Sequence, residues 1–142
     1  MSNPGPASTV TSHPSGLATN QALRLIASAK AVDVNVVGDT IAKIINASGS
    51  VSVASIIVTN ASINLTTAEL AVYTAPAAGG TAVKTAYALS GNSTSAKVVV
   101  TAATSTDLVS GDKLYIRCTT AQGAAATCDV FIYGYDLSFL QG

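Results

Sequence analysis

Few side chains in this sequence could do chemistry, and they show no pattern of a catalytic site. Among the 142 residues there are seven acidic side chains and one histidine, His13, which lies in a segment rich in Pro and Ser. The many serines therefore have no base nearby in the sequence to activate a nucleophile. Asp33, Asp39 and Asp112 lack the spacing of a calcium-binding loop, and the last two follow a glycine in ordinary turn dipeptides. We expect no enzymatic activity, no metal and no cofactor.

Residues 113–135 predict a β-hairpin with a defined register. If its turn centres on Gly123, Arg117 faces Asp129 and Tyr115 faces Phe131. Such ion and aromatic pairs stabilise antiparallel strands by about 0.2–1 kcal/mol each. One face of the hairpin would be apolar core. The other would be an aromatic face that favours contact with a loop or another subunit, and it would carry Tyr115, Phe131, Tyr133 and Tyr135.

The same register would place Cys118 directly opposite Cys128. Opposed residues of an antiparallel pair can meet the Cα separation of a disulfide, about 4.4–6.8 Å. Residues 1–20 lack the basic and apolar regions of a signal peptide, so we expect synthesis in a reducing compartment. Both a disulfide and a pair of buried thiols stay open, and the thiols are favoured because free cysteine is commonly buried. Zinc would be short of ligands.

Most of the chain alternates apolar and polar residues with the period of a β-strand. Residues 21–31 fit either one face of a helix or the beginning of a strand. Eight short strands separated by Gly, Asn, Ser and Pro predict an all-β fold, an antiparallel β-sandwich that is jelly-roll-like. The strands are expected near 31–37, 41–45, 52–59, 67–74, 81–88, 96–103, 113–120 and 126–135.

The first 20 residues differ from the rest of the chain. They contain three of the four prolines and no Asp, Glu, Lys or Arg, a composition that does not fold alone in water. We assign residues 1–22 to an extended N-terminal arm and residues 23–142 to the sandwich domain. A partner would hold the arm, and the candidate contacts in it are Pro4, Pro6, His13 and Pro14.

Composition favours an assembled protein. Hydrophobic residues make up 49% of the chain, but aromatic residues make up only 5% and charged residues 10%. Small apolar side chains each bury little area, and a surface with few charges is poorly solvated. The seven Lys and Arg residues are scattered, which argues against nucleic acid as a partner. The uncharged run 44–68 contains Asn and Gly and alternates like a strand, which argues against a membrane span.

Four groups of residues carry a resemblance to known proteins, and they are Val34–Thr40, Val58–Ser62, Val72–Ala75 with Gly79–Thr81, and Leu114–Thr127. They resemble small β-proteins encoded in the structural modules of tailed bacteriophages. The resemblance covers about three quarters of the chain and implies a virion structural protein, with capsid decoration (cement) as the suggested role. It carries over no functional residues, and the N-terminal arm has no counterpart in it.

These observations together lead us to expect a homo-oligomer, with a trimer favoured, that is made in the host cytoplasm. It would bind the major capsid protein on the capsid surface and bridge neighbouring capsomers. Two alternatives stay open. One is a tail or fibre component that binds carbohydrate through Tyr133 and Tyr135. The other is a fimbrial or adhesin-type subunit, against which the missing signal peptide argues.

Overall fold

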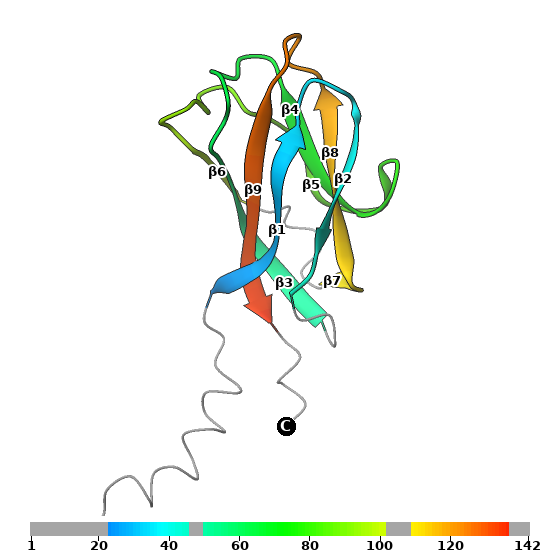
Figure 1. The fold of residues 1–142 in the computed structure, drawn as a ribbon. Helices are drawn as coiled ribbons and strands as arrows, with labels where there is room; N and C mark the ends of the chain where they lie inside the picture. The colour runs from blue at the N-terminus through cyan, green and yellow to red at the C-terminus, as the bar shows by residue number, and fades with distance from the viewer. Residues whose placement is uncertain (1–22, 46–49, 102–108, 137–142) are drawn as a thin grey trace, which may run out of the picture.

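The computed structural model describes residues 23–45, 50–101 and 109–136, and they form two antiparallel sheets (Figure 1). The first sheet has the order β1-β9-β3-β6, with the two-residue strand β7 also paired to β3; the second has the order β2-β8-β4-β5. The described residues include no helix long and apolar enough to cross a membrane. The strands are β1 (Arg24–Asp33), β2 (Gly38–Lys43), β3 (Ser50–Thr59), β4 (Glu69–Ala75), β5 (Gly79–Ala88), β6 (Val98–Thr101), β7 (Val109–Ser110), β8 (Lys113–Thr120) and β9 (Thr127–Asp136).

The strand order is that of a jelly roll. Strands β6 and β7 pair in succession with the same strand, β3, and together they take the place of one interrupted strand. The remaining pairs are nested: β1 pairs with β9, β2 with β8, and β4 with β5. Nested antiparallel pairs divided between two sheets define the jelly roll. The predicted jelly-roll-like sandwich is therefore confirmed.

The hydrophobic core lies between the two sheets. Alternate residues of each strand point inward, as the period of two requires. On β8 these are Leu114, Ile116 and Cys118, and on β9 they are Cys128, Val130 and Ile132, each at most 1% exposed. The sequence correctly predicted this set of core residues.

The predicted hairpin of residues 113–135 is wrong. Strand β8 pairs with β2 and β4 in the second sheet, whereas β9 pairs with β1 and β3 in the first. The connection 121–126 therefore crosses between the sheets, and Val34 holds it through hydrogen bonds of 3.1 and 2.8 Å to Ala126 and Gln122. Two strands that face each other from different sheets bury alternate residues, and so do the two strands of a hairpin. The apolar pattern therefore could not distinguish these two arrangements.

The start of the sandwich also differs from the prediction. Residues 24–33 form β1, so the ambiguous segment 21–31 is a strand from Arg24 onward, and residues 34–37, expected in a strand, form the turn to β2. The Asp33 carboxylate accepts a hydrogen bond of 2.7 Å from the amide of Asn35. This local bond competes with strand pairing and favours the turn. The N-terminal arm, with Pro4, Pro6, His13 and Pro14, lies outside the described residues.

Four connections gather at one end of the sandwich, which we call the loop end: 34–37, 60–68, 89–97 and 121–126 (Figure 1). Strand β1 begins and strand β9 ends at the opposite end. Gln122 ties the loop end together, because its side-chain oxygen accepts hydrogen bonds of 3.1 Å from the amides of Thr66, Thr67 and Ala68. These contacts give the loops a defined shape.

Candidate interaction surface

The aromatic residues predicted to share one face lie on two. Phe131, Tyr133 and Tyr135 point outward from β9 on the first sheet, whereas Tyr115 points outward from β8 on the second. All four are half-buried. The predicted single aromatic face is wrong because β8 and β9 belong to different sheets. Three of its four residues nevertheless lie together.

Phe131, Tyr133 and Tyr135 form a row along β9, near the middle of the first sheet. In the ladder, Phe131 lies between Ser28 of β1 and Ile57 of β3. Ile57 in turn pairs with Val99 of β6, which is 57% exposed. We call Phe131, Tyr133, Tyr135, Ile57 and Val99 the aromatic face.

The neighbours of the two tyrosines are small or apolar. Tyr133 lies between Leu25 of β1 and Ser55 of β3, and Tyr135 pairs with Ser52. None of these paired residues carries a charge. Serines beside large rings leave the sides of the rings uncovered, so the aromatic face offers apolar area to a partner. Aromatic enrichment with few charges is typical of the centre of a protein–protein interface.

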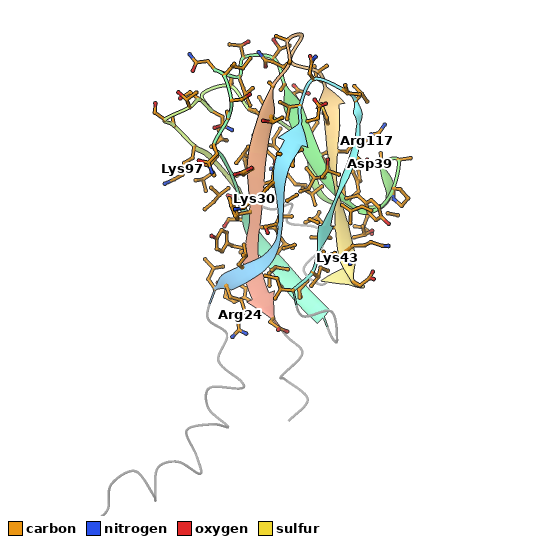
Figure 2. The ribbon with its side chains drawn as sticks, viewed as in Figure 1. Arg24, Lys30, Asp39, Lys43, Lys97 and Arg117 are labelled. Carbon is orange, nitrogen blue, oxygen red and sulfur yellow. The ribbon has the colours of Figure 1, made fainter. Side chains whose placement is uncertain are left out.

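Charged residues lie around the aromatic face. Lys30 and Lys97 project on the side of the first sheet, and Arg24 lies where the chain enters β1 (Figure 2). The Asp129 carboxylate, next in line on β9, accepts hydrogen bonds from the amide of Ala31 at 2.9 Å and the side chain of Asn60 at 3.0 Å. These bonds lower the pKa of Asp129, and Lys30 lowers it further. Three cations, Arg24, Lys30 and Lys97, therefore lie near this face together with the hydrogen-bonded carboxylate of Asp129.

The outer face of the second sheet has a different character. Tyr115 pairs with Ile41 and with Tyr73. Next to this row, Arg117 and Asp39 form an ion pair of 3.0 Å, visible as neighbouring side chains in Figure 2. The other oxygen of Asp39 accepts a 2.7 Å hydrogen bond from the amide of Ala77 in the β4–β5 turn. Charged side chains that already bond to each other and to the β4–β5 turn make this face less suited to burial against a partner.

Cys118 and Cys128 are free, buried thiols on the inner faces of the two sheets. Desolvation by burial raises the pKa of the Cys128 thiol to about 12, with contributions from Asp129 and Cys118. Burial likewise raises the pKa of Cys118, whose thiol donates to the carbonyl of Thr120 at 3.4 Å. Both thiols are therefore protonated at neutral pH, and protonated thiols are poor nucleophiles and poor metal ligands.

The described residues hold no group of three or more His, Cys, Asp or Glu side chains that could bind a metal ion. Among the described residues, the aromatic face combines three rings with uncharged paired neighbours, and we take it as the candidate interaction surface. Sequence reasoning found its tyrosines and Phe131 but missed Ile57 and Val99. Ile57 directly follows Ile56, which is buried. Because successive residues of a strand point to opposite faces, this order in the sequence could have indicated that Ile57 points outward.

In comparisons with known proteins, no family model, no curated protein and no solved structure matches this chain. The aromatic face, the strand order and the sequence are therefore the features from which a function can be inferred.

Proposed function

We propose that this chain is a virion structural protein of a tailed bacteriophage, a capsid decoration (cement) protein that stabilises the head by bridging capsomers. It would act as a homo-oligomer, with a trimer favoured, bound to the major capsid protein on the capsid surface after synthesis in the host cytoplasm. The observation that carries this proposal is the aromatic face, an uncharged row of rings on a chain that has few charges and many small apolar residues.

In protein–protein interfaces, a few residues near the centre contribute most of the binding free energy. Large aromatic side chains at the centre of an interface contribute most of the affinity, and the charged rim adds orientation. On this chain Phe131, Tyr133 and Tyr135 would form the centre. The Lys30 and Lys97 ammonium groups at its margin fit a partner with carboxylates at the corresponding positions. A subunit that binds two neighbours at once adds interface to the shell and raises the free energy needed to separate them.

The fold supports the proposal only by analogy. Jelly rolls occur in viral capsid proteins, but also in lectins and cupins, and a shared fold does not imply a shared function. The resemblance of Val34–Thr40 and the three other groups to phage structural proteins adds support for a virion protein. Immunogold labelling of virions distinguishes a head protein from a tail protein.

The test replaces one ring at the centre of the aromatic face. We expect Tyr133→Ser to weaken binding to capsids lacking the protein by about tenfold or more, as for a central interface aromatic. Tyr73→Ser, a half-buried tyrosine on the opposite sheet, is the matched control and should change affinity by less than about twofold. Cosedimentation with capsids measures the affinity, and thermal unfolding verifies that both variants fold.

Two outcomes would contradict the proposal. One is a full-length chain that stays monomeric in light scattering and does not bind capsids. The other is immunogold labelling of virions that places the chain on tails, which would favour the tail or fibre alternative. Equal binding by Tyr133→Ser and the unaltered chain would remove the aromatic face as the attachment surface.

A further inference from the structure

A polar pocket lies at the loop end, away from the aromatic face. It is formed by two connections, 60–68 and 89–97, and has a volume of about 460 Å³. This lies in the range of about 300–1,000 Å³ that is usual for small-molecule sites. Its polar side chains are those of Asn64, Thr66, Asn92, Ser93 and Ser95, and none of the residues that line it is charged.

The protein's own hydrogen bonds fix the walls of this pocket. The carbonyl of Asn92 accepts a 2.9 Å hydrogen bond from the amide of Leu65, which joins the two connections directly. The hydroxyl oxygen of Ser93 accepts hydrogen bonds from the amides of Ser95 and Ala96 at 3.2 and 3.0 Å. The side-chain oxygen of Gln122 accepts hydrogen bonds from the amides of Thr66 to Ala68. Loops fixed in this way lose little entropy when a ligand binds.

The side chain of Asn92 is left without partners in this otherwise well-bonded region. The residue is 1% exposed, and neither its amide nitrogen nor its amide oxygen has a hydrogen-bond partner among the described residues. Burying an unpaired polar group is costly, so such groups in proteins usually have a specific explanation. The backbone of Asn92 is held at both its N–H and its carbonyl, and the residue lines the pocket, so its amide is an unpaired polar group at this site.

We propose that this pocket binds a neutral saccharide unit. Hydroxyl and amide groups donate and accept hydrogen bonds equally well, which matches the hydroxyl groups of a sugar. An uncharged lining offers nothing to pair with a phosphate, carboxylate or ammonium group. Asn92 would supply two donors and one acceptor oxygen from the floor, with Asn64 and Ser95 at the rim. No aromatic side chain lines the pocket to stack on the sugar, so binding should be weak.

This inference goes beyond the proposed decoration role and does not depend on it. The pocket lies at the loop end, whereas the aromatic face covers the outer side of the first sheet. A decoration protein could attach through the aromatic face and present the loop-end pocket to glycans outside the particle. The site also differs from the sugar contact through Tyr133 and Tyr135 that the sequence suggested.

Saturation-transfer NMR on the full-length chain tests the proposal, with glucose, galactose, mannose and N-acetylglucosamine as probes. At least one neutral sugar should receive saturation. Asn64→Ala and Ser95→Ala remove exposed side chains and should each weaken binding about fivefold, the usual effect of losing one hydrogen bond. Ser90→Ala, an exposed serine outside the pocket, should leave binding unchanged. Asn92→Leu should abolish binding. If this variant does not fold, Asn64→Ala and Ser95→Ala still test whether the sugar binds in this pocket.

Several results would overturn the site. One is the absence of saturation for every neutral sugar at high concentration. Another is sugar binding that Tyr133→Ser removes and Asn64→Ala leaves intact, which would move the contact to the aromatic face. A third is an Asn92→Leu variant that has a higher thermal midpoint and binds sugar as the unaltered chain does. That result would mean that the Asn92 amide contacts only buried water and not the sugar. Capsid binding is measured separately, so neither proposal is affected by failure of the other.

Discussion

Asp129 connects two places where the backbone takes an unusual conformation. Ala31, in the bulge of β1, and Asn60, at the end of β3, both have a positive φ of 54°. This left-handed conformation costs an alanine about 1–2 kcal/mol, whereas asparagine adopts it more readily. The two carboxylate oxygens of Asp129 accept hydrogen bonds from these two residues, and bonds to a charged group are stronger than neutral ones. One side chain thereby bonds to both left-handed positions, of which Ala31 is the strained one.

We expect Asp129→Asn to lower the free energy of unfolding at pH 7 by about 1 kcal/mol, since a neutral amide cannot accept from both donors. The hydrogen bonds from Ala31 and Asn60 lower the pKa of Asp129 in the folded state. Its stabilisation is therefore present above the unfolded pKa, near 3.9, and is lost as the pH falls through the lower folded pKa. Urea unfolding at pH 7, 5 and 3 measures this.

The difference between Asp129→Asn and the unaltered chain should shrink toward pH 3. Asp112→Asn, at an exposed turn, is the matched control and should change stability by less than about 0.5 kcal/mol. A difference that stays constant across this pH range would show that Asp129 acts through shape and not through its charge.

At the scale of elements, the β4–β5 turn joins the central and edge strands of the second sheet with an unexpected sequence. Ala77 and Ala78 have φ values of 56° and 61°, and the amide of Gly79 donates to the carbonyl of Pro76 at 3.0 Å. Positive φ at both central positions is the pattern of a type I′ turn, which prefers Asn and Gly. The turn is thus formed by residues that do not favour it, and the strands on either side hold it in place.

Ala78→Gly should raise the free energy of unfolding by about 0.5–1 kcal/mol, because glycine takes positive φ without the steric cost. Ala86→Gly, at an exposed position inside β5, is the matched control and should lower it by about 0.5–1 kcal/mol. Chemical denaturation of the three proteins gives both values. A lower stability for Ala78→Gly would mean that the turn does not adopt this conformation.

At the scale of the whole molecule, the two sheets are joined along one side and separate along the other. A bridge between Ala27 and Ile44 and a 2.9 Å hydrogen bond from Ile45 to Ile26 connect β1 with β2. Strands β5 and β6 end the two sheets on the other side. Edge strands carry backbone groups that another chain can pair with. They are sites where an arm from a neighbouring subunit could add a strand.

Deleting residues 1–20 should leave the sandwich folded and weaken attachment to the capsid or to the neighbouring subunit. The segment has no Asp, Glu, Lys or Arg, and Pro4, Pro6 and Pro14 limit the conformations that it loses on binding. Fixing its backbone on a partner costs about 1 kcal/mol or more per residue, which the contacts with that partner must exceed. Cosedimentation with capsids compares the two lengths, and equal affinity would make the arm a passive tail.

Local patterning of the sequence was enough to predict the fold class and the core positions of β8 and β9. Alternation of apolar and polar residues is a local property, so strands such as 52–59, 81–88 and 113–120 were predicted within two residues of their observed bounds at β3, β5 and β8. The same alternation identified Leu114, Ile116, Val130 and Ile132 as core. It also indicated that Phe131, Tyr133 and Tyr135 share the opposite face of one strand.

The pairing of strands was fixed by contacts between residues far apart in the chain. Ala31 and Asp129 are 98 residues apart in the chain and bonded in the fold, and no short-range pattern reports such a pairing. A strand buries the same alternate residues whether its neighbour in the chain returns in one sheet or crosses to the other. For this reason the predicted hairpin of residues 113–135 was wrong. Tyr115 lies on a different sheet from the other aromatic residues, and Ile57 and Val99 lie beside those residues instead. The loop-end pocket likewise depends on two connections that meet only because nested strand pairs bring them to one end.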